Sequence, residues 1–103
     1  MTDIETDTKT FSITIMEHPN VEILNFNAPT VGWIGEDFSV TYDAKNNGGE
    51  DTCFGVIIDE TTQQELDRWE ETIVAGGTKS CTHTLNISNT GQKNLILKVG
   101  YIG

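Results

Sequence analysis

The alternation of apolar and polar residues between Phe38 and Ala44 restricts the fold of this chain more than any other feature. The sequence there reads Phe-Ser-Val-Thr-Tyr-Asp-Ala. In a β-strand, such alternation places the apolar side chains on one face and the polar side chains on the other. The run is followed at residues 45–49 by Lys-Asn-Asn-Gly-Gly, and Asn and Gly tolerate the positive φ angles of tight turns. We therefore predict a half-buried strand that ends in a turn.

Five further segments with strand character lie between clusters of Gly, Asn and Asp. They cover residues 21–26, 52–59, 61–73, 80–87 and 94–102. Short strands separated by turn signals at this spacing are typical of a β-sandwich. The expected core consists of the inward apolar residues Phe38, Val40, Tyr42, Phe54, Val56, Leu85, Leu97 and Val99.

Two of these segments are ambiguous. Both alternating sets of segment 52–59 are apolar, and we take the set that contains Phe54 as the inward one, which turns Cys53 and Gly55 outward. In segment 61–73, Thr62 and Glu65 resemble a helical capping box. We favour a strand there, because a helix of about three turns is marginal on its own and the neighbouring strands offer a pairing partner.

Residues 9–16 form one more alternating segment, in which Phe11, Ile13 and Ile15 are separated by Ser12 and Thr14. Pro19 cannot donate a ladder hydrogen bond, so this segment and the next strand are expected in different sheet positions. The acidic residues 1–8 are expected to be a flexible tail. Residues 9–103 are expected to form one all-β domain, an immunoglobulin-like or fibronectin-type β-sandwich of about seven to eight antiparallel strands.

The charge of the chain limits its partners. With 16 acidic and 6 basic residues, the formal net charge is -10, which repels phosphate backbones and anionic lipid headgroups. We therefore expect neither nucleic-acid binding nor insertion into a membrane, for which a run of about 20 apolar residues would be needed. The polar residues 1–7 do not resemble a signal peptide.

The order of the landmarks resembles the CARDB family of cell-adhesion-related domains. The landmarks are the strand over 21–26, the connection from Pro29 to Gly35, the Asn46-Asn47-Gly48 turn, and Ile73-Val74-Ala75-Gly76-Gly77-Thr78 before the strand that begins at Ser80. The resemblance covers roughly Val21 to Gly103. It implies a seven-stranded sandwich of archaeal and bacterial cell-surface proteins, often in tandem arrays and without a catalytic set.

One departure from the CARDB pattern concerns an edge strand. Such domains continue past the strand over 95–101 into a final edge strand, whereas this chain ends at Gly103. Residues 9–16 are the candidate for that place, either as a permuted edge strand or as the last strand of a preceding repeat. We expect them to pair beside the C-terminal strand.

Cys53 and Cys81 are the two cysteines of the chain and the candidates for a disulfide. The expected facing disfavours this bond, because Cys81 points inward and Cys53 outward, although a β-bulge at Gly55 would reverse the facing of Cys53. A zinc site would also need His18 and His83, at spacings that match no common zinc motif. Cys81 and His83 share one strand face, and we expect a buried thiol and a hydrogen-bonded histidine rather than a catalytic pair.

Three further features suggest ligands or modification. Asp3, Glu5 and Asp7 place carboxylates at alternate positions and are weak calcium candidates, although they lack the turn Gly and final Glu of an EF-hand loop. Asn86 begins the glycosylation sequence Asn-Ile-Ser. The aromatic residues Trp33, Trp69 and Tyr101 are candidates for a sugar-stacking platform.

For each of these features, a role in the fold is a simpler explanation than a role in binding or catalysis. We therefore expect neither an enzyme nor a bound cofactor. We expect a structural or adhesive module of a microbial cell surface or virion, binding protein partners or neighbouring copies, as one unit of a tandem array. The alternatives are a carbohydrate- or calcium-binding accessory module and an intracellular chaperone-like sandwich.

Overall fold

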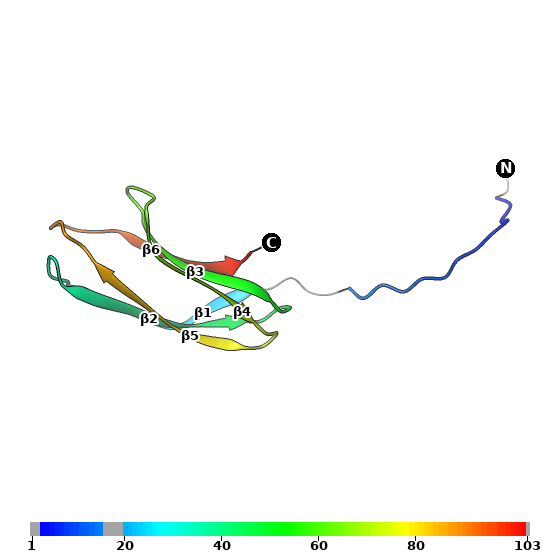
Figure 1. Cartoon of the computed structure of the whole chain (residues 1–103), viewed down its shortest axis with the longest axis horizontal. Coiled ribbons are helices and arrows are strands. Elements are labelled where there is room, and N and C mark those ends of the chain that lie inside the picture. Colours follow the sequence, from blue (N-terminus) through cyan, green and yellow to red (C-terminus); the bar gives the residue numbers. More distant parts are fainter. Residues whose placement is uncertain (1–2, 16–19, 103) are drawn as a thin grey trace.

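The computed structural model describes residues 3–15 and 20–102. Within these residues the fold is all-β, with six antiparallel strands in two three-stranded sheets and no helix (Figure 1). The strands are β1 (Val21–Asn27), β2 (Asp37–Asn46), β3 (Asp51–Asp59), β4 (Glu65–Ile73), β5 (Thr78–Asn86) and β6 (Leu95–Tyr101). The strand orders are β1-β2-β5 and β4-β3-β6. We call residues 20–102 the body and residues 3–15 the arm.

The two sheets pack against each other around two apolar clusters. The first cluster consists of Tyr42, Ala44, Cys53, Ile73 and Cys81, and the second of Val40, Ile57 and Leu85. Each cluster draws residues from both sheets. β4 lies next to β5 along one side of the body, and β1 lies next to β6 along the other. The inward positions predicted for Val40, Tyr42 and Leu85 are confirmed.

The strand interpretation of segment 61–73 is also confirmed, because β4 occupies its larger part. Thr62 does not cap a helix; its hydroxyl accepts a hydrogen bond from the Gln64 backbone at 3.3 Å in the turn before β4. Leu66 is an extra residue at a β-bulge, since Ile58 pairs with Glu65 and Ile57 with Asp67. The bulge turns Leu66 toward the second apolar cluster.

The predicted facing of β3 was wrong, although Val56, one of the expected core residues, is buried. Cys53 and Ile57 are buried between the sheets, whereas Phe54 lies on the opposite face of the strand, with the Arg68 guanidinium 4.8 Å from its ring centroid. The register of β3 is continuous through Gly55 in both of its strand pairs. A bulge at Gly55 is therefore not the cause of the inversion.

Gly55 itself explains why its set of residues faces inward. A Cβ atom at this position would overlap with the indole of Trp69 and the hydroxyl oxygen of Tyr42. These two large side chains meet above the bare glycine backbone, so the absence of a side chain makes room for them. A prediction that uses only side-chain hydrophobicity places such a glycine on the outward face of the strand.

Asn46 ends β2, as the turn signal predicted, and its buried side chain joins three other segments. The carbonyl oxygen of the side chain accepts hydrogen bonds from the backbone N–H groups of Asn20 (3.3 Å) and Gly48 (3.0 Å). The Nδ2 group donates to the backbone carbonyls of Gly49 (2.8 Å) and Ile73 (3.0 Å). All four hydrogen-bonding positions of the amide are thus used inside the protein.

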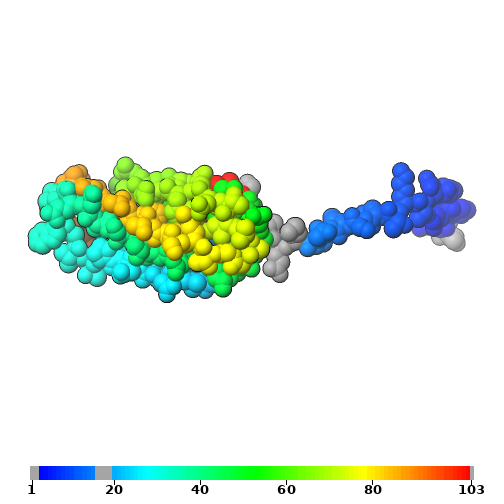
Figure 2. All heavy atoms as spheres, turned by 60° about the horizontal axis from the view of Figure 1, so that its bottom comes forward, coloured from blue at the N-terminus to red at the C-terminus, as the bar shows by residue number. Residues whose placement is uncertain are grey.

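The strand expected over residues 9–16 is not formed in the single chain. Residues 9–15 have no strand pairing, and Met16 lies outside the described residues. The described residues therefore contain six strands rather than seven to eight. The arm extends away from the body and gives the molecule a longest dimension of 76 Å, against 29 and 16 Å in the other directions (Figures 1 and 2). A single alternating segment cannot bury its apolar face without a neighbouring strand.

Candidate functional site

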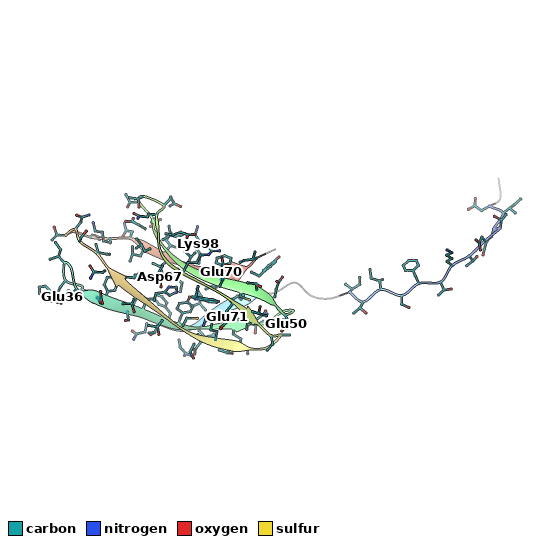
Figure 3. All side chains as sticks on the ribbon, in the orientation of Figure 1. Glu36, Glu50, Asp67, Glu70, Glu71 and Lys98 are labelled. Carbon is teal, nitrogen blue, oxygen red and sulfur yellow. The ribbon has the colours of Figure 1, made fainter. Side chains whose placement is uncertain are left out.

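A chain of hydrogen bonds crosses the interior on the β4–β5 side. Asp67 and Trp69 come from β4, His83 from β5 and Tyr42 from β2. The His83 Nδ1 atom lies 2.8 Å from Asp67 Oδ2, and His83 Nε2 lies 2.8 Å from the Tyr42 hydroxyl. The Trp69 indole donates to the same hydroxyl at 2.7 Å. Asp67 lies midway along the body, distant from Glu36 and Glu50 near the two ends (Figure 3).

The chemistry of these groups determines where the protons lie. An indole nitrogen can only donate, so the Tyr42 oxygen accepts from Trp69. A carboxylate can only accept, so His83 Nδ1 carries a proton and donates it to Asp67. With this tautomer assigned, the Tyr42 hydroxyl donates to His83 Nε2, and both ring nitrogens are satisfied.

This network is built to hold the sheets together rather than to bind a substrate. His83 is 0% exposed, and both of its ring nitrogens are occupied by partners within the protein. Burial raises the pKa of Tyr42, so its phenol stays protonated. The Cys81–His83 pair considered from the sequence does not form, because His83 bonds to Tyr42 and Asp67 instead. Among these side chains, only Asp67 is substantially exposed, at 41%.

The two cysteines are free thiols in the first apolar cluster. The Cys53 thiol lies 3.5 Å from the Asp51 carbonyl oxygen, and the Cys81 thiol lies 3.4 Å from that of Lys79. Burial raises the pKa of both thiols, which keeps them protonated and unreactive. The expected outward position of Cys53 is wrong, because Gly55 directs this set of residues inward.

The other side of the body, between β1 and β6, opens into an apolar groove of about 220 Å³. Its lining includes Phe26 of β1 and Leu95 and Leu97 of β6. The core residues Val40 and Ile57 also line it, although each is buried. The apolar interior is thus accessible from this side. The β4–β5 side, by contrast, is bridged by the Asp67–His83 hydrogen bond and by an ion pair between Lys79 and Glu71 at 3.0 Å.

A second hollow, of about 410 Å³, lies at the end of the body away from the arm. Residues 29–34 and 87–93 form most of its lining. It shares four lining residues with the groove, namely Pro29, Phe38, Lys93 and Leu95, so the two depressions are continuous. Trp33 lies in this hollow and is 73% exposed. A protein surface that combines a groove with exposed apolar side chains is suited to binding another chain.

The calcium candidates Asp3, Glu5 and Asp7 all lie in the exposed arm. Asp7 accepts a hydrogen bond from the Thr8 backbone at 2.8 Å, and Glu5 accepts one from the Thr8 hydroxyl. Among the described residues, no group of three or more His, Cys, Asp or Glu side chains is placed to hold a metal ion. His18, the fourth candidate zinc ligand, lies outside the described residues.

The remaining candidates lie apart from one another. Asn86 is exposed on β5, and its amide donates to the Gly35 carbonyl at 3.0 Å and to Asp37 at 2.9 Å, so a glycan on this nitrogen would displace two hydrogen bonds. The three aromatic residues do not form one platform. Trp33 lies at the far end, Trp69 packs against the core, and Tyr101 ends β6 near the arm.

Sequence reasoning missed Asp67 and the groove. The signal for Asp67 was present, since it alternates with Trp69 and Ile73 in a strand and must therefore share their face. The groove had no local signal, because its lining comes from four strands and from the connections next to them.

No protein-family model, curated protein or solved structure matches this chain. The resemblance to the CARDB family therefore stays a prediction, and the function has to be inferred from the geometry. In the described part of the chain, no helix has the length and apolar character of a membrane span.

Proposed function

We propose that this chain is a structural or adhesive module with an immunoglobulin-like β-sandwich fold, which acts through contacts with neighbouring copies in an array. The single observation that carries the proposal is the placement of its exposed apolar side chains. Most of them lie on the arm, at the far end of the body around Trp33, and at the end next to the arm, where Val74 and Ile102 are 58 and 41% exposed. The others, Ile23 and Phe26, lie on β1. Apolar surface at both ends of an elongated unit suits end-to-end assembly.

The interior supports the same proposal. The ionisable and thiol groups inside the body are protonated or bound to one another, so what the body offers to other molecules is its edges, ends and groove. An acidic surface with a net charge of -10 keeps such a module soluble while its apolar contacts remain specific.

A seventh strand supplied from an arm would bring the fold to the strand number that the CARDB resemblance implies. A microbial cell surface is the setting that this resemblance favours, and a virion is the second setting that we propose.

Sedimentation velocity of the full chain tests the proposal. From low micromolar to near-millimolar concentration we expect species larger than the monomer to appear and to grow with concentration. They should persist at high salt, because the contacts are apolar rather than ionic. A chain that stays monomeric over the whole range would contradict a self-assembling module.

Carbohydrate binding is the second candidate, and the exposure of Trp33 is the observation that favours it. The hollow around Trp33 also contains the polar side chains of Asn89, Thr90 and Gln92, and sugar sites combine an aromatic face with such groups. Titration with soluble glycans, followed by tryptophan fluorescence, should then give a saturable change that Trp33→Ala abolishes. The partly buried Trp69 provides the matched control, because its fluorescence should not respond.

A further inference from the structure

We infer that residues 9–15 of one copy of this chain add as a strand to β6 of a second copy and fill its apolar groove. The inference rests on the proposed function, because it names the partner and the contact of that assembly. β6 lies at the edge of its sheet, next to β3. Strand addition at a sheet edge is a general mode of recognition, in which main-chain hydrogen bonds provide affinity and pockets for alternate side chains provide specificity.

The arm and β6 have matching patterns. Phe11, Ile13 and Ile15 occupy alternate positions of the arm and are 82, 73 and 82% exposed. The inward residues of β6 also alternate: Leu95, Leu97 and Val99 pack against the core clusters. Residues 9–15 and β6 are both seven residues long. A strand from the arm would therefore place three apolar side chains beside three apolar side chains.

The groove shows where those side chains would go. It is lined by Phe26 on the β1 side and by Leu95 and Leu97 on the β6 side, and it reaches the buried residues Val40 and Ile57. An added strand beside β6 would lie over this opening and bury its own apolar face there. Between its apolar residues the arm carries Ser and Thr, which would remain on the solvent side.

The direction of the strands favours a second copy as the donor. β1 is antiparallel to β2, and β6 is antiparallel to β3. Because a short turn joins β2 to β3, β1 and β6 run in opposite directions, and an arm folded back onto its own β6 would run parallel to it. An arm from another copy can run antiparallel, as do all the strand pairs of the body. Antiparallel pairing is also the slightly more stable arrangement.

Antiparallel addition would also bring the apolar ends of two neighbouring bodies into contact. With Ile13 beside Leu97, the donor leaves the groove at the start of β6, which is the end that carries Trp33. The body of the donor follows there and presents its arm-bearing end, where Val74 and Ile102 are exposed. The same arrangement would thus bury the arm and bring the two apolar ends together.

Such a contact does not close on itself. Each copy uses its arm as donor and its groove as acceptor, so a pair still has one free arm and one free groove. Head-to-tail contacts of this kind generate open chains of copies. The assembly expected is therefore a linear series without a fixed number of members.

The first experiment removes the apolar face of the arm. In the triple variant F11T/I13T/I15T the substituted side chains are exposed in the single chain, so the body should fold as before. We expect sedimentation velocity to show loss of all species larger than the monomer. The matched control is Ile4→Thr, which removes an apolar side chain of the arm that is 84% exposed but lies outside residues 9–15; it should assemble like the wild type.

The second experiment fixes the partner and the direction by cross-linking. If Ile13 lies beside Leu97, Ser12 lies beside Lys98 on the outward face, at a separation that suits a disulfide. A protein carrying Ser12→Cys is mixed with a second protein carrying Lys98→Cys under mild oxidation. We expect a covalent pair on non-reducing gels, and no such pair when Ile4→Cys replaces Ser12→Cys. The native cysteines are buried and should not interfere.

The outcomes separate this inference from the proposed function. If the wild type assembles and F11T/I13T/I15T assembles equally well, strand addition is wrong while a self-assembling module still stands. If the mixture yields no covalent pair but one chain with both substitutions closes on itself, the arm binds its own body and the second-copy assignment is overturned. A wild type that never assembles overturns both proposals.

Discussion

The Trp69 indole donates a 2.7 Å hydrogen bond to the Tyr42 hydroxyl, and both groups lie against the backbone of Gly55. This contact joins β4 of one sheet to β2 of the other. It passes over β3 at Gly55, which has no side chain to block it. The facing of β3, the burial of Cys53 and the placement of His83 all depend on it.

Gly55→Ala is expected to destabilise the body strongly. The new methyl group would overlap with Trp69 and Tyr42, and overpacking of this kind typically costs about 1–3 kcal/mol. Urea unfolding followed by circular dichroism measures the loss. The matched control is Gly32→Ala, whose Cβ would lie 3.7 Å from Phe38, an ordinary contact distance. Equal stability of the two variants would contradict the packing described for Gly55.

Tyr42→Phe should destabilise the protein and remove part of its alkaline sensitivity. The substitution leaves the Trp69 indole N–H and the His83 Nε2 atom without their partner, at about 1–3 kcal/mol for each unsatisfied group. Burial raises the pKa of Tyr42 above the value of about 10 found in unfolded chains, so the unfolded state loses this proton first. The contribution of the protonated phenol is therefore complete below about pH 10 and is lost as the pH rises above it.

Urea unfolding at a series of pH values checks the pH dependence. Between neutral pH and the alkaline range, the free energy of unfolding should fall more steeply for the wild type than for Tyr42→Phe. Other tyrosine and lysine side chains titrate in both proteins, so the difference between the two curves isolates Tyr42. Parallel curves would show that Tyr42 has an ordinary pKa.

The network predicts the Nδ1–H tautomer of His83, because the Asp67 carboxylate beside Nδ1 can only accept. Long-range proton–nitrogen correlation spectra distinguish the two neutral forms of a histidine ring. We expect the signal of His83 to report the Nδ1–H form at neutral pH, because Nε2 accepts from Tyr42. A signal from the Nε2–H form would reverse the two hydrogen bonds of His83, to Tyr42 and to Asp67, whereas the Trp69 indole would still donate to Tyr42.

Asn46→Ala should be among the most destabilising changes of a polar residue. It removes four hydrogen bonds that join the residue before β1, the turn after β2 and the end of β4, and it leaves the Gly48 N–H and the Ile73 carbonyl without these buried partners. We expect a loss of about 3 kcal/mol in thermal or urea unfolding. Asn47→Ala is the matched control, because Asn47 is exposed and the substitution removes its side-chain bond to Glu22 but keeps its backbone bond to Asn20. It should change stability by less than about 0.5 kcal/mol.

The position of the strands could be predicted from the sequence because alternation and turn residues are local signals. The segment around Val40 alternates strictly and has polar residues at its end, and the structure confirms its face, although β2 is longer than the predicted segment and runs from Asp37 to Asn46. β3 shows the limit of this reasoning. Both of its sets are apolar, so local hydrophobicity does not select a face, and the decisive contact comes from Tyr42 and Trp69, which lie on other strands.

The candidate sites were predictable only in part, for the same physical reason. The inward position of His83 follows from alternation, but its partners Asp67 and Tyr42 are 16 and 41 residues away in sequence and meet it only through the packing of two sheets. The arm shows the reverse case. Its alternation predicted a strand, but residues 9–15 pair with no strand of the described chain, because alternation by itself supplies no partner.

The thiols of Cys53 and Cys81 should be protected in the folded protein and reactive once it unfolds. Both are buried in one cluster, and burial raises the pKa of each, so little thiolate is available to attack a reagent. With Ellman's reagent at mildly alkaline pH we expect slow reaction of the native chain. After denaturation without reductant, two thiols per chain should react at once, since the chain has two cysteines.

The raised pKa values of the thiols also make the stability of the protein depend on pH. Because the folded-state pKa of each thiol lies above the value of about 8.5 found in unfolded chains, the thiols contribute their full stability below that pH. The contribution is lost as the pH rises above it, so protection from Ellman's reagent should weaken in the alkaline range. Rapid labelling of the native protein at neutral pH would contradict the burial of both thiols. A denatured chain that shows no free thiol until reductant is added would establish the disulfide that the structure does not contain.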